Sequence, residues 1–202
     1  MSIVAAGSSN ASGSTLERMG DALSSLSEDV VARARGIRLF ASDVDGVLTD
    51  GRLHFHDHGE GVREGKSFSI LDGLGIKLLQ ESGVVVALIT GRRSDIVTRR
   101  AQEMGVRHVI QGADDKARAW TTLLADLGVA AAASAYIGDD WPDLPVIRAC
   151  GLGITVPDAP ALLRSQACYV TRAAGGAGAV REACELIMTA QGTLQARLER
   201  WL

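Results

Sequence analysis

Aromatic side chains and cysteines are both scarce in this 202-residue sequence. Aromatic residues make up only 4% of it, which argues against the stacking platforms with which proteins bind single-stranded nucleic acid. The three cysteines (Cys150, Cys168 and Cys184) are odd in number and widely spaced, and no CxxC pair indicates zinc. We expect free thiols in a reducing cytoplasm rather than a disulfide framework.

The sequence also lacks an excess of positive charge and any long apolar run. Its formal net charge is -3, whereas proteins that bind nucleic acid usually carry a basic excess. No apolar stretch reaches the ~18 residues of a membrane span. The N-terminus has neither the basic start nor the apolar centre of a secretion signal. We therefore expect a cytoplasmic protein with no nucleic-acid or membrane partner.

Along the chain the composition changes at three points. Residues 1–14 are small and polar, which is typical of a disordered segment. Residues 15–36 carry apolar side chains at spacings of three and four, which predicts an N-terminal helix. Residues 37–192 predict one domain with enough length for a single substantial core. Leucines four apart predict a helical extension over residues 193–202.

Predicted strands alternate with predicted helices in the domain. The run 84–90 is apolar and mainly β-branched, which is typical of a strand buried on both faces. The expected strands are 37–40, 84–90, 106–111, 134–137 and 153–156. The expected helices are 94–104, 115–127, 142–150 and 180–190. This alternation predicts an α/β fold: a Rossmann-like three-layer sandwich with a mainly parallel central sheet.

One segment, residues 51–70, breaks the alternation. It predicts two extended arms around a turn rich in Gly and charge, a β-hairpin flap in place of a cap domain. Such a flap would stand over the carboxyl ends of the strands, where open α/β sheets bind ligands. Its charges at 57–66 are most simply a solvated surface. His54, His56 and His58 alternate along one arm, so they are either solvated, which we favour, or metal ligands.

Two acidic clusters each follow a predicted strand. Asp43 and Asp45 belong to the segment DVDGVLTDG, and residues two apart in an extended chain point the same way. The second cluster, GDDWPD, contains Asp139, Asp140 and Asp143. Clustered carboxylates repel one another unless a cation or a proton is shared among them. Oxygen ligands without Cys or His nearby favour Mg²⁺ over zinc.

Two further motifs lie between the acidic clusters. Thr90-Gly91-Arg92 follows the strand 84–90 and offers a hydroxyl, a backbone N–H and a guanidinium. Lys116 begins a predicted helix and supplies a fixed positive charge. Phosphoryl transfer needs a nucleophile, a metal and donors for the phosphoryl oxygens. Each motif alone is weak, because an isolated DxD is usually a turn or a helix cap. Four motifs in order, each at a strand end, are hard to explain structurally.

The order DxDGVLTDG, TGR, Lys116 and GDDxxD resembles the haloacid dehalogenase superfamily of phosphohydrolases. The segment Asp72-Gly73-Leu74-Gly75-Ile76 and the tail YVTRAAGGAGAVRE at 169–182 resemble, more narrowly, its capless 3-deoxy-D-manno-octulosonate 8-phosphate phosphatase family. The resemblance covers residues 37–192. It implies hydrolysis of a small phosphorylated sugar acid through an aspartyl-phosphate, with a role in lipopolysaccharide biosynthesis.

The resemblance also implies the roles of the motif residues. Asp43 would be the nucleophile, and Asp45 the general acid and then the general base. Asp43, Asp45 and Asp139 would hold Mg²⁺, Asp45 through its backbone carbonyl. Thr90 and Lys116 would bind the phosphoryl oxygens.

Asp143 is expected to orient Lys116, and Asp140 to support the metal through water. The family is tetrameric, so a homotetramer is expected, in which the hairpin and the tail of neighbouring subunits help to enclose the pocket. An Arg suits the substrate carboxylate because its guanidinium can bind it bidentately. The expected substrate-binding residues are Thr49, Asp72, Gly91, Arg92, Arg172, Gly175 and Gly176.

Other functions are compatible with parts of the sequence. Leu71 stands where family members often carry Arg, so the substrate could be a related nonulosonate phosphate or another small sugar phosphate. A receiver domain also arranges Asp, Thr and Lys around Mg²⁺, but the DxD pair on the first strand disfavours it. A catalytically silent oligomerisation domain is disfavoured because every catalytic position is present. A P-loop kinase is excluded for want of GxxxxGK[ST].

Overall fold

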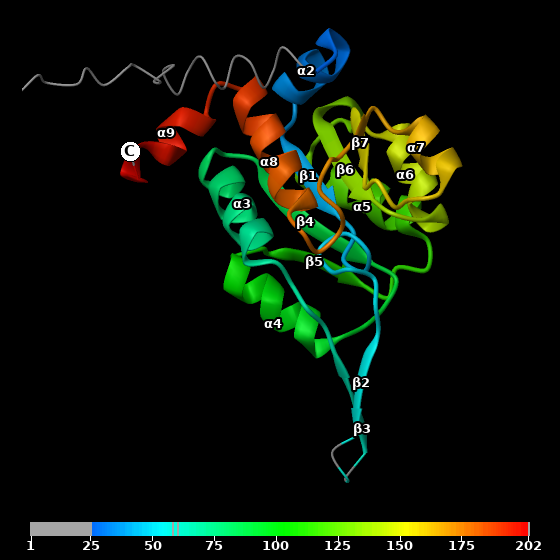
Figure 1. Ribbon diagram of the computed structural model, residues 1–202. Coiled ribbons are helices and arrows are strands. Elements are labelled where there is room, and N and C mark those ends of the chain that lie inside the picture. Colours follow the sequence, from blue (N-terminus) through cyan, green and yellow to red (C-terminus); the bar gives the residue numbers. More distant parts are fainter. Residues whose placement is uncertain (1–25, 58, 60, 202) are drawn as a thin grey trace, which may run out of the picture.

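The computed structural model describes residues 26–57, 59 and 61–201. The expected disordered segment 1–14, the part of the expected N-terminal helix before residue 26, and His58 lie outside these residues. A sheet runs through the middle of the molecule with helices on both sides, and a long hairpin projects from one end (Figure 1). Within the described part of the chain, no helix is long and apolar enough to cross a membrane.

Six parallel strands form the central sheet in the order β5-β4-β1-β6-β7-β8. Their bounds are β1 Leu39–Ser42, β4 Val85–Thr90, β5 His108–Gln111, β6 Ser134–Gly138, β7 Leu152–Thr155 and β8 Tyr169–Val170. The expected fold class, an α/β sandwich with a mainly parallel sheet, is confirmed. In the central strand β1 every residue is buried, which matches a strand covered on both faces.

The helices form two layers over this sheet. Helices α2, α3, α4 and α8 group on one side in Figure 1, and α5, α6 and α7 on the other. Their bounds are α2 Glu28–Arg35, α3 Ile70–Glu81, α4 Asp95–Met104, α5 Lys116–Leu127, α6 Leu144–Ala149, α7 Ala161–Gln166, α8 Ala179–Ala190 and α9 Leu194–Leu198. The described residues also form short 3-10 turns, η1 Ala131–Ala133, η2 Trp141–Asp143 and η3 Glu199–Trp201.

Strand β1 runs further than the apolar run 37–40 predicts, through Ala41 and Ser42. Small side chains are accommodated there because β4 and β6 pair with β1 on both edges. The Ser42 hydroxyl is fully buried and donates to the Asp43 carbonyl oxygen at 2.6 Å. The strand therefore ends directly at Asp43, and this places that carboxylate at the rim of the sheet.

Helix α3 is an element that the sequence pattern did not predict. Its first turns contain Gly73 and Gly75, which lower intrinsic helix propensity. Packing explains both glycines: a Cβ on Gly73 would lie 2.4 Å from Arg100 Nη2, and one on Gly75 would lie 2.9 Å from Arg181 Cα. The two glycines allow α4 and α8 to approach α3 closely. Helix α7 and strand β8 were likewise not predicted.

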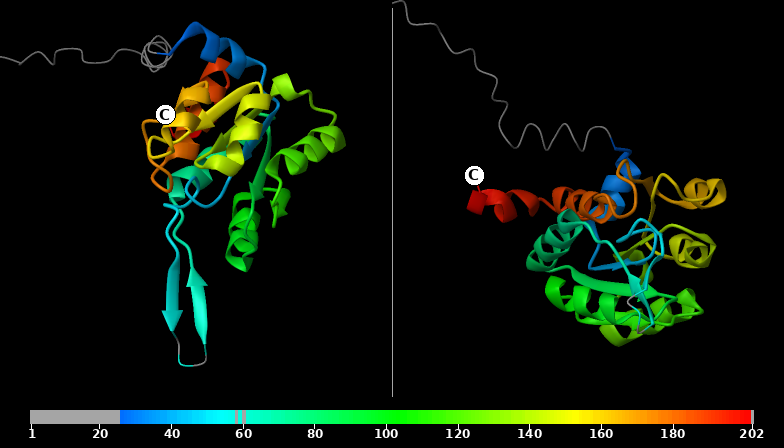
Figure 2. Two further views of the ribbon diagram at one scale, coloured as in Figure 1. Left: turned by 90° about the vertical axis from the view of Figure 1, so that its right-hand side faces the viewer. Right: turned by 60° about the horizontal axis from the view of Figure 1, so that its bottom comes forward.

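The expected hairpin is present as β2 His54–Asp57 and β3 Val62–Gly65, which pair antiparallel. Figure 2 shows it extending well away from the sheet and its helices. Its base joins the loop that follows β1 and leads into α3, so its stem stands at the carboxyl ends of the strands.

Candidate active site

A cavity of about 470 Å³ opens at the carboxyl ends of the parallel strands. The chain leaves β1 towards β4 in one direction and reaches β6 in the other, which is the position where open α/β sheets bind ligands. Much of the lining comes from residues that the sequence motifs nominated. They are Asp43, Asp45, Thr90, Gly91, Arg92, Lys116, Asp139, Asp140 and Asp143. Segments far apart in the sequence therefore converge on one cavity.

Asp43 is buried at the end of β1. Its Oδ1 accepts a hydrogen bond from Val44 N at 2.7 Å, which fixes one oxygen while the other faces the cavity wall formed by Lys116. Gly46, three residues on, has φ of +86°, a conformation that non-glycine residues rarely adopt. A Cβ there would also lie 2.0 Å from Asp139 Oδ2. The glycine lets the loop turn away and lets Asp139 approach it.

Thr49 does not line the cavity within this chain, so its role in substrate binding stays a prediction. Its side chain is buried beneath the loop that follows β1. The hydroxyl oxygen accepts hydrogen bonds from Gly46 N at 3.3 Å and Gly51 N at 3.2 Å. Thr49 therefore stabilises the loop from inside, because its hydroxyl oxygen accepts hydrogen bonds from two N–H groups of the same turn.

Lys116 joins Asp43 to Asp143 by two contacts of equal length. Its Nζ lies 2.7 Å from Asp43 Oδ2 and 2.7 Å from Asp143 Oδ1. The Asp143 carboxylate is fully buried and accepts from Tyr136 OH at 2.6 Å. Its other oxygen accepts from Asp139 N at 3.1 Å. The ammonium group is thus held beside Asp43 by a carboxylate that is itself fixed from several sides.

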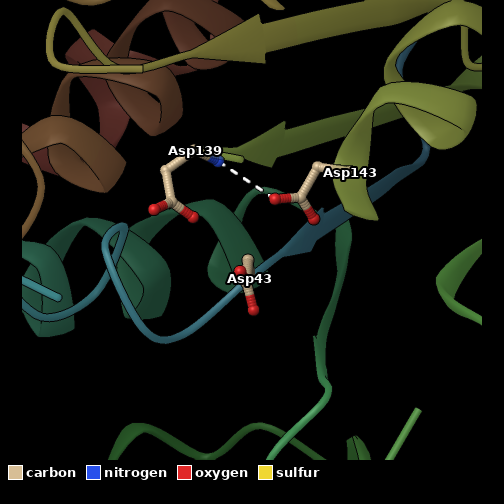
Figure 3. A group of neighbouring side chains, drawn as sticks. All are labelled: Asp43, Asp139 and Asp143. Carbon is tan, nitrogen blue, oxygen red and sulfur yellow. Dashed lines mark hydrogen bonds between the residues drawn. The ribbon is translucent and has the colours of Figure 1, made fainter. Parts of the chain in front are cut away.

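Figure 3 shows the Asp43, Asp139 and Asp143 carboxylates pointing toward one another from β1, the end of β6 and the turn η2. Burial, followed by the charge of Asp143, raises the pKa of Asp43 to about 8 and that of Asp139 to about 6. Burial would lower the pKa of Lys116, but the carboxylates of Asp43 and Asp143 outweigh it and raise that pKa. Negative charge is therefore in excess here.

The donor set fits a magnesium ion. Among the described residues, Asp43, Asp139 and Asp143 form the group whose oxygens lie close enough to share a cation, all within 4.8 Å of one another. Asp143 is the least available of the three, because Lys116, Tyr136 and backbone N–H groups already occupy it. The described lining of the cavity offers carboxylates but no His or Cys. Such hard oxygen donors suit Mg²⁺.

The hairpin contributes Lys66, which the sequence analysis missed. Its side chain is fully buried, and Nζ contacts Asp45 Oδ1 and lies 3.1 Å from Glu64 Oε1. The expectation that the charges at 57–66 are all solvated is therefore wrong for Glu64 and Lys66. The reason is that the base of the hairpin, where β3 ends, lies against the loop carrying Asp45. The half-buried Phe68, two residues beyond Lys66, was the available signal that the stem turns inward.

Arg92 continues this cluster towards the outside. Its Nη2 lies 3.2 Å from Glu64 Oε2, and its Nε lies 3.9 Å from Asp45 Oδ2. The side chain is 45% exposed, so it remains able to move onto a ligand. Thr90 is buried beneath it at the end of β4, where its Oγ1 accepts from Arg92 N at 3.4 Å. Asp45 Oδ2 is buried and makes no hydrogen bond within the described structure.

Asp72 does not line the cavity within this chain, so its role in substrate binding likewise stays a prediction. It is 1% exposed, in the first turn of α3, and its Oδ1 accepts from Arg181 N at 2.8 Å near the start of α8. Burial raises the pKa of Asp72, while backbone N–H groups of α8 oppose that shift. A carboxylate at a helix N-terminus satisfies otherwise unpaired N–H groups. Asp72 therefore ties α3 to α8.

The tail before α8 packs on the loop that follows β1. Gly175 lines a smaller cavity of about 120 Å³ that it shares with Gly46 and Asp139. The N–H of Gly176 donates to Val47 O at 2.9 Å. Arg172 lies outside both cavities: its side chain is 85% exposed and pairs with Glu182, with 3.5 Å between Arg172 Nε and Glu182 Oε1. The two glycines thus lie beside the site, whereas Arg172 within this chain does not.

Of the three histidines expected on the hairpin, His54 and His56 lie within the described residues. His54 Nε2 is buried without a hydrogen-bond partner, and His56 pairs across the hairpin with Arg63 in the strand register. Neither belongs to a group of three His, Cys, Asp or Glu residues able to share a cation, within the residues described.

Comparison with known proteins gives consistent results. The family model of the haloacid dehalogenase-like hydrolases matches residues 95–182. The chain is 46% identical over 169 residues to the 3-deoxy-D-manno-octulosonate 8-phosphate phosphatase KdsC of Escherichia coli (strain K12). This match covers 84% of this chain and 88% of that protein. The Yersinia pestis protein of the same name is also 46% identical, over 84% of this chain and 89% of its own length.

Solved structures show the same likeness. The 3-deoxy-D-manno-octulosonate 8-phosphate phosphatase of Moraxella catarrhalis, in complex with magnesium, phosphate and KDO, superposes with a TM-score of 0.83 at 45% identity. The match covers 86% of this chain and 98% of that one. The cobalt-bound Haemophilus influenzae phosphatase has a TM-score of 0.74 at 42% identity, over 79% of this chain and 92% of that one.

Proposed function

The chain belongs to the haloacid dehalogenase-like hydrolases and, within them, to the 3-deoxy-D-manno-octulosonate 8-phosphate phosphatase family, and from this membership we propose its reaction and its residues. The protein is a magnesium-dependent phosphatase of lipopolysaccharide biosynthesis that releases phosphate from 3-deoxy-D-manno-octulosonate 8-phosphate. One observation supports the site above all others. The buried Asp43 carboxylate faces Asp139 and is held by Lys116 at 2.7 Å, in a cavity at the strand ends.

In the first half of the reaction, Asp43 attacks the phosphorus atom and becomes an aspartyl-phosphate. Hydrogen bonds from Val44 N and Lys116 Nζ hold its carboxylate in one orientation, which removes orientational entropy before the bond forms. Lys116 and the Thr90 hydroxyl donate to the phosphoryl oxygens as their negative charge is redistributed. The protein therefore supplies the covalent nucleophile together with fixed donors around it.

Asp45 gives its proton to the leaving sugar oxygen and then accepts a proton from the attacking water. Its position two residues after Asp43, in the cavity lining, suits this role. Lys66 contacts Asp45 Oδ1 from the hairpin, and so restrains the carboxylate while leaving Oδ2 free of hydrogen bonds. Once the aspartyl-phosphate is hydrolysed, Asp43 returns to its carboxylate form.

Asp43 and Asp139, together with the backbone carbonyl of Asp45, are the groups that would hold Mg²⁺, and Asp140 would support it through water. The ion supplies charge neutralisation at the transferring phosphoryl group. The raised pKa values of Asp43 and Asp139 point to a site built for a positive charge, because a cation offsets the cost of gathering and burying carboxylates. Asp143 instead orients Lys116.

Gly91 and Arg92 are the residues of this chain placed to recognise the sugar acid. They line the mouth of the cavity beside Asp45, and the Arg92 guanidinium suits a carboxylate. Gly175 and Gly176 contribute by supporting the loop from the adjoining side. Arg172 is exposed and would contact a substrate only if a neighbouring subunit brought it to another cavity.

Exposed apolar side chains support a homotetramer. Phe55 and Val62 on the hairpin are 63% and 67% exposed, and Ile70 and Leu71 at the start of α3 are 82% and 52% exposed. These side chains lie in two places, on the hairpin and at the start of α3, and exposed apolar patches are typical of surfaces buried by a partner. We place the assembly in the cytoplasm, in line with three free cysteines. Light scattering after size exclusion tests the state: a monomer at micromolar concentration would contradict it.

Phosphate release in the presence of Mg²⁺ tests the function. The panel contains 3-deoxy-D-manno-octulosonate 8-phosphate, a nonulosonate 9-phosphate and a simple hexose phosphate. Asp43→Asn should lower kcat at least about 1,000-fold, as loss of a covalent nucleophile does. Asp126→Asn makes the same change on an exposed position of α5 and should leave kcat unchanged. Wild-type turnover by Asp43→Asn would exclude the covalent route.

The same panel decides between sugars. Leu71 occupies the position where the family often carries Arg, and it lies exposed in the first turn of α3 rather than in the described lining of the cavity. The absence of Arg at this position favours the nonulosonate alternative only if the Arg of other family members contacts substrate within its own subunit. A higher kcat/KM on the nine-carbon acid than on the eight-carbon acid would assign the protein to that alternative.

A further inference from the structure

Tyr136 is a polar side chain at the centre of the molecule that the reaction as described does not use. It lies on β6, next to the central strand β1, and is fully buried. Its hydroxyl donates to Asp143 Oδ1 at 2.6 Å. Burying a hydroxyl costs free energy unless it is hydrogen-bonded, and a carboxylate acceptor offsets that cost best.

The Asp143 carboxylate is saturated by its partners. Oδ1 accepts from Tyr136 OH and lies 2.7 Å from Lys116 Nζ, while Oδ2 accepts from Asp139 N at 3.1 Å and Asp140 N at 3.2 Å. Two backbone donors fix one oxygen. The other is fixed only by Lys116 and Tyr136, so the Tyr136 hydroxyl decides where Oδ1 lies when Lys116 moves.

Lys116 carries this effect to the reacting group. The same Nζ that contacts Asp143 Oδ1 lies 2.7 Å from Asp43 Oδ2. An ammonium on a flexible stem takes its position from the acceptors around it. If Asp143 Oδ1 rotates, Nζ follows it or loses it, and in either case its distance to Asp43 changes. A continuous chain of contacts therefore runs from Tyr136 through Asp143 and Lys116 to Asp43.

We propose that Tyr136 is a positioning residue of the phosphatase, one that aligns Lys116 on Asp43 by locking the Asp143 carboxylate. The assignment rests on the proposed function, since Asp43 is taken as the nucleophile. It deepens that function by extending the machinery to a residue inside the sheet. Phe would fill the same volume, so the hydroxyl is what the alignment requires.

The test uses Tyr136→Phe, which deletes the hydroxyl and leaves no large cavity. We expect kcat to fall about tenfold, since small displacements of reacting groups carry large rate costs. KM should change less than about twofold, because the groups at the mouth of the cavity are untouched. A merely structural hydroxyl would lower the melting temperature without this split between kcat and KM.

Ser134→Ala is the matched control. Ser134 lies on the same strand, is also fully buried, and its hydroxyl donates to Ala131 O at 2.8 Å, at the end of β6 remote from the site. It should lose stability comparable to that lost by Tyr136→Phe and keep wild-type kcat. An equal fall of kcat in both variants, or a kcat within about twofold of wild type in Tyr136→Phe, overturns the proposal.

A second measurement separates this proposal from the choice of substrate. Trifluoroberyllate, in the presence of Mg²⁺, mimics a phosphoryl group bound to an aspartate and requires no turnover. Its dissociation constant should rise about tenfold in Tyr136→Phe and stay unchanged in Ser134→Ala. Equal affinity in wild type and Tyr136→Phe refutes the positioning role even if the sugar has been misidentified. No binding by wild type would refute Asp43 as the phosphoryl acceptor, and Tyr136 with it.

Discussion

Replacing Gly175 by Ala probes how closely the tail must approach the catalytic loop. A Cβ at Gly175 would lie 1.9 Å from Gly46 O and 2.6 Å from Gly46 C. Both are backbone atoms, so no side chain can move aside to relieve the contact. To bring a separation of 1.9 Å up to 3.0 Å, the tail and the loop must part by about 1.1 Å. Gly46 directly follows Asp45, so the displacement falls on the proposed general acid.

The expected magnitudes follow from this displacement. A misplacement of about 1 Å costs up to about 100-fold in rate, and the tail will absorb part of it, so we expect kcat to fall between about 10-fold and 100-fold. Overpacking costs about 1–3 kcal/mol, and each kcal/mol lowers Tm by roughly 2–4 °C in a chain of this size. The loss of activity should therefore exceed what the modest loss of stability alone produces.

The assay is Mg²⁺-dependent phosphate release from 3-deoxy-D-manno-octulosonate 8-phosphate, beside thermal unfolding followed by circular dichroism. Gly36→Ala is the control. Gly36 has φ of -87°, and a Cβ there would meet only Arg33 O, at 3.7 Å. Its activity and Tm should match the wild type. A Gly175→Ala protein that folds and keeps kcat within about twofold of the wild-type value would refute the idea that activity requires the close packing of the tail against the loop.

Three further predictions concern charge and capping. Lys66→Met should lower kcat about tenfold and the free energy of unfolding by about 1–3 kcal/mol. This loss of stability is smaller than that for a fully buried ion pair because the partners of Lys66 are partly exposed. Arg63→Met, on the exposed hairpin, should change neither quantity. In EDTA, the Tm should fall as pH rises from about 4 through about 8, because the raised pKa values of Asp43 (about 8) and Asp139 (about 6) favour the folded state only while these groups are protonated. Excess Mg²⁺ should abolish this fall in Tm. A Tm that rises with pH in EDTA would contradict the charge assignment. Asp72→Ala should lower the free energy of unfolding in urea by about 1–2 kcal/mol, because it removes a cap of α8, and should leave KM nearly unchanged. A large rise in KM would instead indicate that Asp72 binds substrate.

The catalytic cluster was predictable because parallel strands impose a strong constraint. Their carboxyl ends meet at one rim, so Asp43, Thr90 and Asp139, each at or just past a strand end, had to lie near one another. Lys116 follows the same logic from the start of α5. For these residues, position in the sequence pattern was nearly equivalent to position in space.

Thr49 and Asp72, expected among the substrate-binding residues, do not line the cavity, because family motifs record which residues recur and not where each short side chain points. Backbone N–H groups donate to both side chains, to Thr49 Oγ1 within its own loop and to Asp72 Oδ1 at the start of α8. Lys66 was missed for the opposite reason. It lies in a run of charges whose local pattern is typical of a solvated hairpin, and its burial depends on contacts between the hairpin base and the loop carrying Asp45.

The charges around the cavity account for its need of a divalent cation. Five carboxylates lie buried, half-buried or in ion pairs there: Asp43, Asp45, Glu64, Asp139 and Asp143. Three cationic side chains pair with them: Lys66, Arg92 and Lys116. With these eight groups all ionised, and with the exposed Asp114 and Asp140 of the lining left aside, the difference is two negative charges, which one Mg²⁺ neutralises. Without the two charges of the hairpin stem, Glu64 and Lys66, this difference would be the same, since they cancel. Their effect is therefore local: Lys66 places a positive charge beside Asp45, and Glu64 pairs with Arg92 at 3.2 Å.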